Sequence, residues 1–339
     1  MADQTYWAMQ ALGGGKLAMA TLPLREPGKG EVRIRVEACG ICHTDVLTVD
    51  GQYPGIAYPR VPGHEVVGRI DAVGEGVQQW RVGQRVGVGF LGGSCGHCNF
   101  CRRGDLINCK NQLLSGIHYD GGYAEVMIAK DRGLVSIPDD MSSTDAAPLL
   151  CAGVTTFNAL RKSPALAGEL VVIHGLGGLG HLAVQFSRYM GFRTVVIARG
   201  PDKAELALKL GAHSYIDSEA ENAAKALRKM GGASVIVATV SSTAAMAPLI
   251  SGLKPHGQLA VVGAGLEPLK VNVGDLIFGE RSIIGVNTGS PIEIEDTLDF
   301  SQLQNIRAMN ETFPLADAQA AYDRMHANKA RFRIVLTMG

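Results

Sequence analysis

The pattern of hydrophobic and polar positions changes at about residue 168 and divides the chain into two kinds of segment. Before that point, short β-rich segments alternate with glycine and proline, which predicts an antiparallel or barrel-like body. The clearest of these segments are EVRIRVE (31–37), EVVGRIDAV (65–73) and RVGQRVGVGF (81–90).

After residue 168 short apolar strands alternate with helices of about ten residues. Strands are expected at 170–174, 194–198, 214–217, 234–239, 258–263 and 282–287. Helices are expected between them at about 180–190, 202–210, 219–230 and 243–252. This alternation is typical of a parallel sheet that is covered on both faces. A helix at 293–300 and a strand at 331–337 are expected to follow.

With 339 residues the chain is long for a single core, so two domains are expected. The pattern predicts an α/β domain at 153–286, inserted into a β-rich domain that is made from both ends of the chain. The fold class is therefore α/β plus β.

Composition and charge exclude several classes of function. Lys plus Arg equals Asp plus Glu at 32 each, which argues against a nucleic-acid partner. No apolar run approaches the roughly 18 residues of a membrane span, so no membrane partner is expected. The seven cysteines occur without a recognisable export signal, which favours metal ligation in a reducing compartment over disulfides. We therefore expect a cytoplasmic protein.

Four cysteines, here called the cysteine lobe, gather in one short segment. The spacing C-x2-C-x2-C-x7-C is formed by Cys95, Cys98, Cys101 and Cys109. Four thiolates this close can supply the complete tetrahedral shell of a structural zinc. An iron–sulfur cluster is the alternative, but its usual run has a three-residue last gap and a following Pro, whereas here the gap is seven and Lys110 follows. Zinc is therefore predicted, and His97 is expected to be an exposed loop residue.

A second possible metal site is spread along the chain. Cys42, His64 and Cys151 together offer two thiolates and one imidazole, the three-ligand set of a catalytic zinc with an open fourth position. Each alone is weak, because a single Cys or His is usually a core residue. The remaining cysteine, Cys39, is expected to be a small buried hydrophobe.

A glycine-rich turn at 175–180 has the sequence GLGGLG and matches G-x-G-x-x-G. It follows a predicted strand and opens a predicted helix, the context in which this motif binds the pyrophosphate of a dinucleotide. The expected contacts are Gly175, Gly177, Gly178, Leu179 and Gly180.

The end of the second strand of the α/β domain indicates which dinucleotide is preferred. An NAD site usually has Asp or Glu there, but this chain has Ala198 and Arg199, with no acid before Asp202. Arg can pair with a 2′-phosphate, which a carboxylate would repel. NADP(H) is predicted as the preferred cofactor and NAD(H) as the second; an exposed Arg199 with NAD(H) in use is the alternative.

The motif set resembles that of the zinc-containing medium-chain dehydrogenases, specifically the zinc alcohol dehydrogenases of the bacterial and yeast type. The motifs that carry the resemblance occur in family order: CHTD (42–45), GHE (63–65), the cysteine lobe, CAGVT (151–155) and GLGGLG (175–180). The resemblance covers essentially the whole chain. It implies a GroES-like catalytic domain at 1–152 and 287–339, with the zinc lobe at about 92–112, and a Rossmann domain of about six strands at 153–286. It also implies an active site in the cleft between the domains and a homotetramer.

The resemblance implies a role for each residue of the second metal site. Cys42, His64 and Cys151 become the ligands of a catalytic zinc. Asp45 matches a carboxylate that orients the zinc-bound histidine. Glu65 matches a residue near the metal that can approach it transiently.

Further matches concern the substrate and the cofactor. Thr44 matches the hydroxyl that hydrogen-bonds the substrate oxygen, and His43 matches a position that touches the cofactor pyrophosphate. Many relatives carry a His five residues after the first zinc cysteine, where it relays the proton to solvent, but this chain has Leu47. The relay is therefore expected to end at a ribose hydroxyl, at water or at another group.

The remaining matches are less specific. Phe90 falls where the family has a pocket aromatic, and Tyr53 is a looser candidate for the same wall. Either Arg331 or Arg333 is expected to reach the cofactor phosphates.

The reaction implied is reversible hydride transfer between a primary alcohol, aliphatic or aromatic, and NAD(P), with zinc acting as a Lewis acid on the substrate oxygen. Two zinc ions per subunit are expected. A polyol or sugar dehydrogenase of the same superfamily is the main alternative. A zinc-stabilised nucleic-acid-binding protein and a zinc-free quinone reductase of the same fold are disfavoured by the neutral charge, the dinucleotide motif and the six assigned cysteine ligands.

Overall fold

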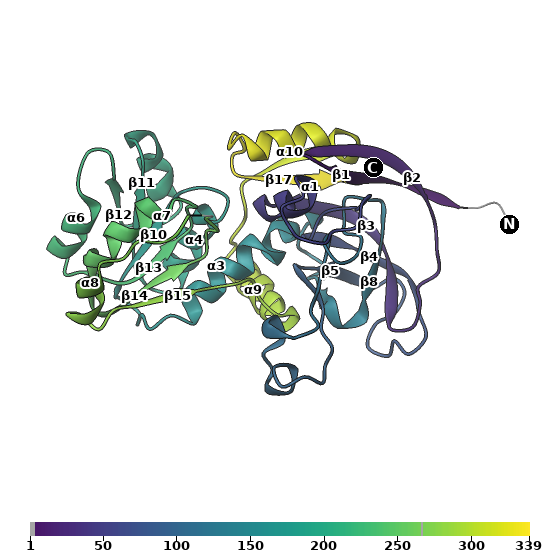
Figure 1. Cartoon of the computed structure of the whole chain (residues 1–339), viewed down its shortest axis with the longest axis horizontal. Coiled ribbons are helices and arrows are strands. Elements are labelled where there is room, and N and C mark those ends of the chain that lie inside the picture. Colours follow the sequence, from purple (N-terminus) through teal and green to yellow (C-terminus); the bar gives the residue numbers. More distant parts are fainter. Residues whose placement is uncertain (1–3, 266) are drawn as a thin grey trace. The chain divides into compact units, whose positions relative to one another are not determined.

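The computed structural model describes residues 4–265 and 267–339. The chain divides into two compact units, one formed by Met1–Val154 with Thr288–Gly339 and one by Thr155–Asn287. We call them the β-rich unit and the α/β unit and describe each by itself (Figure 1). Among the described residues, none of the helices combines the length and the apolar character needed to cross a membrane.

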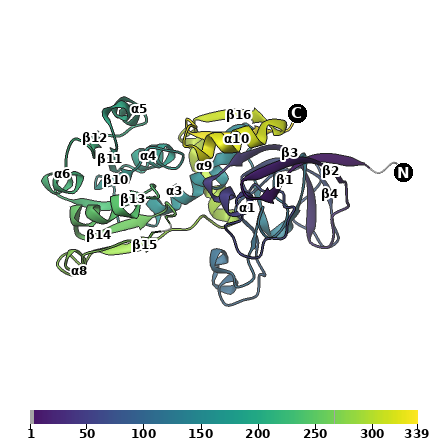
Figure 2. The ribbon, with the colours of Figure 1, turned by 45° about the horizontal axis from the view of Figure 1, so that its top comes forward.

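The β-rich unit is built on a sheet in which the two ends of the chain meet. In the part of the chain that the structure describes, this sheet has seven strands: β16 (Asn310–Pro314), β17 (Arg333–Thr337), β3 (Glu31–Ile41), β4 (Val66–Val73), β5 (Arg85–Val88) and β9 (Leu134–Ser136) in that order, with β8 (Val126–Lys130) on β3. Strand β17 pairs antiparallel with β3, so that Leu336 lies opposite Cys39. Figure 2 shows this yellow C-terminal segment beside the purple N-terminal strands.

Smaller elements complete the β-rich unit. The strands β1 (Thr5–Gly13) and β2 (Lys16–Pro23) form a hairpin, and β6 (Leu91–Gly93) pairs with β7 (Leu113–Leu114). The helical segments are the 3-10 turns η1 (His43–Asp45), η2 (Cys101–Arg103), η3 (Leu106–Asn108), η4 (Asp131–Gly133), η5 (Ala147–Leu150) and η8 (Leu315–Asp317), with α1 (Val46–Val49), α2 (Ser143–Ala146), α9 (Pro291–Leu303) and α10 (Ala318–His326). Helix α3 (Ala152–Arg161) begins at the end of this unit and continues into the other.

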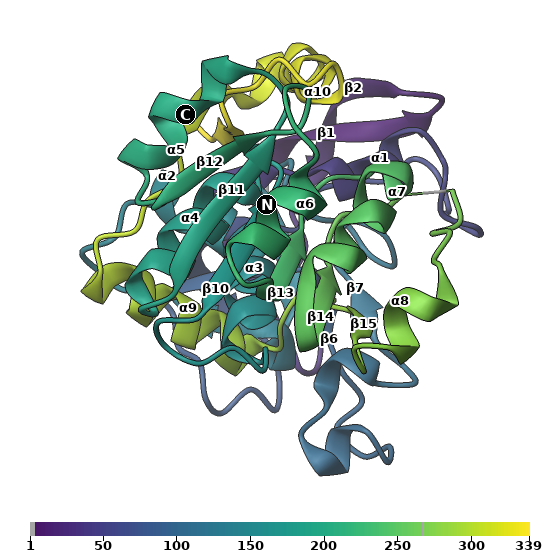
Figure 3. The same ribbon diagram turned by 90° about the vertical axis from the view of Figure 1, so that its left-hand side faces the viewer.

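The α/β unit contains a parallel sheet, which has six strands among the residues that are described. Its order is β12 (Ser214–Asp217), β11 (Arg193–Ala198), β10 (Leu170–His174), β13 (Ala233–Ala238), β14 (Leu253–Val261) and β15 (Ser282–Gly285). Figure 3 shows these strands in that sequence across the sheet. Every residue of β10 and β13 is buried, as expected for the central strands of a sheet that is covered on both faces. The predicted fold class, α/β plus β, is confirmed.

The helices of the α/β unit follow its strands in alternation. They are α4 (Gly180–Tyr189), α5 (Ala204–Lys209), α6 (Ala223–Lys229), α7 (Thr243–Met246) and α8 (Val273–Ile277), with the 3-10 turns η6 (Pro201–Lys203) and η7 (Ala247–Gly252). The helix expected at 219–230 begins later, at Ala223, because the side chain of Asn222 caps it by accepting from the Lys225 N–H. The helix expected at 243–252 consists of α7 followed by a 3-10 turn, η7.

Candidate metal centres and cofactor site

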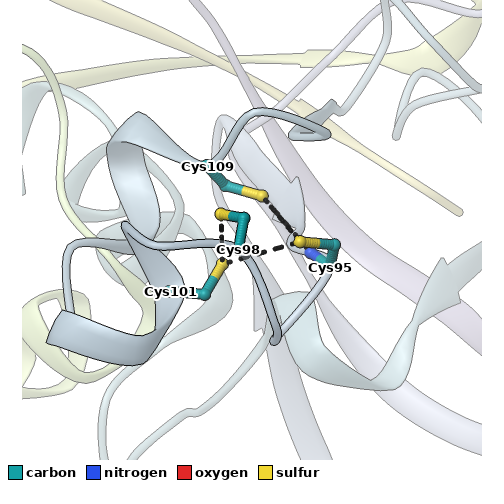
Figure 4. Close-up of side chains that lie close together, drawn as sticks. All are labelled: Cys95, Cys98, Cys101 and Cys109. Atoms are coloured by element: carbon teal, nitrogen blue, oxygen red, sulfur yellow. Dashed lines mark hydrogen bonds between the residues drawn. The ribbon is translucent and has the colours of Figure 1, made fainter.

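The cysteine lobe forms the first cluster, on the loop between β6 and β7 (Figure 4). All four sulfur atoms lie within 4.8 Å of one another. The Sγ–Sγ distances are 3.6 Å for Cys98–Cys101, 3.6 Å for Cys95–Cys109 and 4.0 Å for Cys95–Cys101. Four sulfurs about 2.3 Å from a central zinc would be separated by roughly 3.8 Å at tetrahedral angles. The donor set and its spacing therefore fit a tetrahedral zinc.

Backbone amides donate hydrogen bonds to sulfur atoms of the cysteine lobe. The N–H groups of Cys95 and Asn111 donate to Cys109 Sγ over 3.3 and 3.4 Å. The backbone N–H of His97, followed by that of Cys98, lowers the pKa of Cys95 to about 6. His97 itself is exposed and bonds through Nδ1 to the Cys95 carbonyl, so it lies outside the sulfur shell.

The second cluster, here called the buried cluster, consists of Cys42, His64, Glu65 and Cys151. Cys42 follows β3 and caps η1. His64 and Glu65 directly precede β4, and Cys151 follows η5. One ligand atom from each residue lies within 4.8 Å of the other three, and the two sulfurs are 3.8 Å apart. The structure thus brings together the three residues that the sequence singled out, with Glu65 beside them.

Two atoms of the buried cluster fit a cation directly. His64 Nε2 and Glu65 Oε2 are both buried and have no hydrogen-bond partner among the described residues. An unpaired buried acceptor is costly, and a metal ion is one way to satisfy it. Gly40 makes room for Glu65, since a Cβ at that position would lie 1.9 Å from Oε2.

Asp45 fixes the orientation of His64. Its Oδ1 lies 3.0 Å from His64 Nδ1, and its Oδ2 accepts from the Cys42 N–H over 2.9 Å and from the Tyr123 hydroxyl over 2.8 Å. The proton on Nδ1 is therefore directed at Asp45, and Nε2 is left to bind a metal. Tyr123 was not predicted from the sequence; it is 78 residues from Asp45 and lies in no motif.

The electrostatics of the buried cluster favour at least one thiolate. A hydrogen bond from the Cys151 thiol, supported by His64, lowers the pKa of Cys42 well below its ordinary value. The same hydrogen bond raises the pKa of Cys151. Burial opposes a charged His64, but the Asp45 carboxylate and Cys42 together outweigh it, and the pKa of His64 is raised.

Arg333 on β17 lies buried against Glu65, with its Nη2 donating to Oε1. Burial raises the pKa of Glu65 to about 7, although the guanidinium pulls in the opposite direction. The sequence offered Arg333 or Arg331 for the cofactor phosphates and did not predict this ion pair. Arg331 is exposed. The phosphate role of either arginine stays a prediction.

The other predicted residues of the β-rich unit lie at different distances from the buried cluster. The Phe90 ring packs edge-to-face on His64, with centroids 5.2 Å apart. Thr44 is half-buried next to the cluster and its N–H donates to Cys42 Sγ over 3.5 Å. Tyr53 instead contacts His118, with its hydroxyl 3.3 Å from Nε2.

Cys39 and His43 differ sharply in exposure. Cys39 is completely buried in the core of the β-rich unit, and its Sγ lies near Gly63, where an added Cβ would be only 2.8 Å away. His43 is exposed, and its ring lies beside that of His326.

The glycine-rich turn of the α/β unit joins β10 to α4. Gly175 has a φ of +102°, and a Cβ there would lie 2.7 Å from Thr239 Oγ1; a Cβ at Gly180 would lie 2.0 Å from the Gly175 carbonyl oxygen. Gly177 is different, because a Cβ there would meet nothing within 4 Å. Helix α4 begins without a side-chain cap, so no side chain occupies the position in front of its N-terminus as a cap. A phosphate group fits this turn.

The end of β11 carries cations and no acid. Ala198 is its last residue, and the exposed Arg199 follows. Lys203, four residues after Arg199, is a second cation that was not predicted as a site residue, and its Nζ lies 3.4 Å from the Arg199 carbonyl oxygen. The nearby Asp217 carboxylate accepts from the Gly200 and Glu219 amides over 2.9 Å each, so backbone groups already satisfy it.

Two family models match the chain. The alcohol dehydrogenase GroES-like domain matches residues 28–139, and the zinc-binding dehydrogenase domain matches residues 178–302. The first contains the cysteine lobe and three residues of the buried cluster, and the second contains most of the α/β unit.

Individual proteins are similar over nearly the full length. An alcohol dehydrogenase of Aspergillus sp. (strain MF297-2) is 41% identical over 327 residues, which cover 96% of this chain and 95% of that protein. The structure of a cinnamyl alcohol dehydrogenase from Sorghum bicolor is 32% identical, with a TM-score of 0.88 and 98% of each chain covered. The structure of CAD from Helicobacter pylori complexed with NADP(H) is 27% identical, with a TM-score of 0.86, covering 99% of this chain and 98% of that one.

Proposed function

Since the chain belongs to the zinc-containing medium-chain alcohol dehydrogenase family, we propose that Cys42, His64 and Cys151 hold a catalytic zinc and that the cysteine lobe holds a structural one. The protein is an oxidoreductase that interconverts alcohols and aldehydes with a nicotinamide cofactor. The observation that carries the zinc assignment is the convergence of two thiols and an unpartnered imidazole nitrogen from three separate chain segments. Three protein ligands leave one position for a substrate.

When bound, the zinc supplies Lewis-acid polarisation of the substrate oxygen and the nicotinamide supplies or accepts the hydride. The protein supplies orientation and charge. Asp45 holds the imidazole of His64 in one tautomer, and Phe90 shields the same ring on one side. The hydroxyl of Thr44, two residues after Cys42, accepts the substrate proton and passes it on.

Leu47 cannot receive that proton, so the route to solvent passes through a ribose hydroxyl, water or another group. Glu65 provides a further carboxylate beside the metal position and is held by Arg333. Its free oxygen Oε2 is near enough to the cluster to act as a transient ligand.

We propose NADP(H) as the preferred cofactor and NAD(H) as the second. Arg199 and Lys203 place two cations after the strand end at which an NAD site has an acid, and Ala198 cannot repel a 2′-phosphate. Gly175 and Gly177 to Gly180 would receive the pyrophosphate at the start of α4.

We propose a homo-oligomer, a tetramer by the resemblance of the sequence. Strand β15 is the edge of its sheet among the described strands, and three apolar side chains of α8 and its C-cap are exposed: Val273 by 63%, Ile277 by 64% and Phe278 by 91%. An exposed edge strand with an apolar flank is a surface that a second copy of the chain can cover. A cytoplasmic location agrees with the seven free cysteines.

The activity is tested with a panel of primary aliphatic alcohols, aromatic alcohols and polyols, and with the matching aldehydes, each with NADPH or NADP⁺ and with NADH or NAD⁺. We expect the highest kcat/KM for primary alcohols and aldehydes with the phosphorylated cofactor. Higher values for polyols would favour the polyol dehydrogenase alternative, and a clear preference for NAD(H) would contradict the cofactor proposal.

A further inference from the structure

A cavity of about 430 Å³ lies in the β-rich unit and is lined by residues of the β1–β2 hairpin and of strand β8. Its volume is within the roughly 300–1,000 Å³ that is usual for small-molecule sites. Among the described residues that line it, none belongs to the buried cluster or to the cysteine lobe. The cavity is therefore a site separate from the metal centres, and all of its walls belong to one unit of the chain.

Backbone hydrogen bonds hold the walls of the cavity in place. Ala11 of β1 and Arg60 exchange two such bonds, over 2.7 and 3.2 Å, and the Gly121 N–H donates to the Val61 carbonyl over 2.8 Å. Arg60, Val61 and Gly121 all line the cavity. The site is thus largely formed before a ligand binds, which lowers the cost of binding.

The lining of the cavity carries more positive than negative charge. It contains the cations Arg25, Arg60 and Lys130 and the carboxylates Glu31 and Asp120. Arg25 and Lys130 share Glu31, at 2.9 and 2.8 Å from its oxygens. Although burial opposes the charge, these hydrogen bonds lower the pKa of Glu31 to about 2, so that it is ionised. One positive charge is therefore left over, which a bound monoanion would balance.

Arg60 has hydrogen-bond donors that the protein does not use. Among the described residues its guanidinium, which carries five N–H groups, makes one hydrogen bond, from Nη1 to Asp120 Oδ1 over 3.0 Å. None of the described residues pairs with its buried Nε, and the side chain as a whole is 17% exposed, so a ligand can reach it. Tyr6 also lines the cavity; burial, followed by the Asp120 carboxylate, raises the pKa of Tyr6, so its hydroxyl keeps the proton and can donate.

Much of the remaining lining is apolar. Val61 and Val126 are almost completely buried, and Ile128, two residues beyond Val126 and so on the same face of β8, is half-buried. Leu22 of β2 contributes from the hairpin. An inorganic anion would leave this apolar surface uncovered, whereas an anion with a hydrocarbon part would remove it from water.

We propose that this cavity binds a small organic monocarboxylate, with the carboxylate at Arg60 and Tyr6 and the hydrocarbon part against Val126 and Ile128. One negative charge matches the surplus of the lining, and the guanidinium is the cationic group best suited to a carboxylate. The site does not depend on the proposed dehydrogenase activity, because the residues that carry it are not those of the buried cluster.

The test is isothermal titration calorimetry of hexanoate, hexanamide and inorganic phosphate with the zinc-loaded enzyme. Hexanamide keeps the hydrocarbon chain without the charge, and phosphate keeps a charge without the chain. We compare the wild type with Arg60→Gln, which removes the cation, and with Arg60→Lys, which keeps it. The matched control is Arg35→Gln, because Arg35 also pairs with an aspartate, Asp71, in the β-rich unit but does not line the cavity. Circular dichroism and zinc content establish that each variant is folded.

We expect Arg60→Gln to weaken hexanoate by about tenfold to a hundredfold, the range for a lost hydrogen bond to a charged group. Arg60→Lys should retain part of the affinity, Arg35→Gln should match the wild type, and hexanamide and phosphate should bind the wild type more weakly than hexanoate. A carboxylate can also bind a zinc ion with an open position, so equal hexanoate affinity in the wild type and Arg60→Gln would mean that it binds elsewhere and would overturn the inference. Absence of hexanoate binding, or binding of hexanamide or phosphate as tight as that of hexanoate, would overturn it too.

Ile128→Asn is a second variant that leaves Arg60 in place and tests the apolar wall. It should weaken hexanoate by about threefold to tenfold, because part of the hydrocarbon chain loses its apolar contact. Unchanged hexanoate affinity in this variant would contradict the proposed site even if Arg60→Gln failed to fold.

Discussion

The carboxylate of Asp45 lies 3.0 Å from Nδ1 of His64, and both side chains are almost completely buried. The contact leaves Nε2 of the imidazole as the free nitrogen in the buried cluster. A residue that binds no substrate therefore decides which tautomer of His64 faces the metal position.

Replacing Asp45 by Asn keeps the shape of this contact and removes its charge. We expect zinc affinity at the buried cluster to fall by about tenfold to a hundredfold, because the imidazole becomes a weaker ligand. Titration with a competing chelator measures the affinity, and kcat measured in parallel should fall. Asp120→Asn is the matched control, since Asp120 pairs with Arg60 on the surface and touches no member of the cluster. Equal zinc affinity in both variants would contradict the orienting role of Asp45.

Leu47→His places a titratable group where many relatives have one. We expect the variant to show an additional inflection between about pH 5 and 8 in kcat/KM for alcohol oxidation, because an imidazole changes charge there. Leu47→Asn is the control, a polar side chain that does not titrate in this range. An unaltered pH–rate profile in Leu47→His would count against the proton route proposed here.

Arg199→Ser should reduce kcat/KM for NADPH by about tenfold to a hundredfold, the range for a lost hydrogen bond to a charged group. The value for NADH should change little, because that cofactor has no 2′-phosphate. The comparison requires steady-state kinetics with both cofactors. Arg193→Ser, at the opposite end of β11, is the control for a lost surface charge. A parallel loss with both cofactors would show that Arg199 does not read the phosphate.

His174, the last residue of β10, makes folding stability depend on pH. Burial lowers its pKa from 6.5 to about 4. In the unfolded chain His174 is therefore protonated below about pH 6.5, whereas in the folded chain it stays neutral down to about pH 4. The free energy of unfolding is therefore unaffected by His174 above pH 6.5. It falls as the pH decreases from 6.5 to about 4, by about 3 kcal/mol in total.

This prediction is checked by urea denaturation at several pH values between 7.5 and 5 for the wild type and His174→Gln. Acid can also release zinc, so the comparison concerns the difference between the two proteins and not either curve alone. We expect the free energy of unfolding of the wild type to fall more steeply than that of His174→Gln. Parallel curves would mean that His174 is not the group responsible.

Local spacing and periodicity made much of the fold and the cysteine lobe predictable, whereas the roles of Cys42, His64 and Cys151, which are far apart in the chain, came from the family resemblance. The cysteine lobe lies within fifteen residues and needs no long-range information. The alternation of strands and helices after residue 168 predicted the order of the α/β elements. The GLGGLG turn was recognisable from its spacing and context, and the structure shows that close contacts require glycine at Gly175 and Gly180.

Other features could not be predicted because they depend on contacts between distant segments. Arg333 and Glu65 are 268 residues apart, and neither the pairing of β17 with β3 nor the burial of the guanidinium follows from a motif. Helix α10 was missed although a signal existed, because Ala318, Ala321 and Tyr322 are buried with helical spacing. The β1–β2 hairpin was missed although three consecutive glycines, Gly13–Gly15, mark its turn.

The central claim is that Cys42, His64 and Cys151 hold one zinc ion and the cysteine lobe another. The most direct measurement is the zinc content per subunit of the wild type, Cys151→Ser and Cys109→Ser, determined by mass spectrometry of the metal and combined with turnover of a primary alcohol. We predict two zinc ions in the wild type and one in Cys151→Ser, with activity lost while the lobe zinc is retained. Two zinc ions and full turnover in Cys151→Ser would contradict the claim.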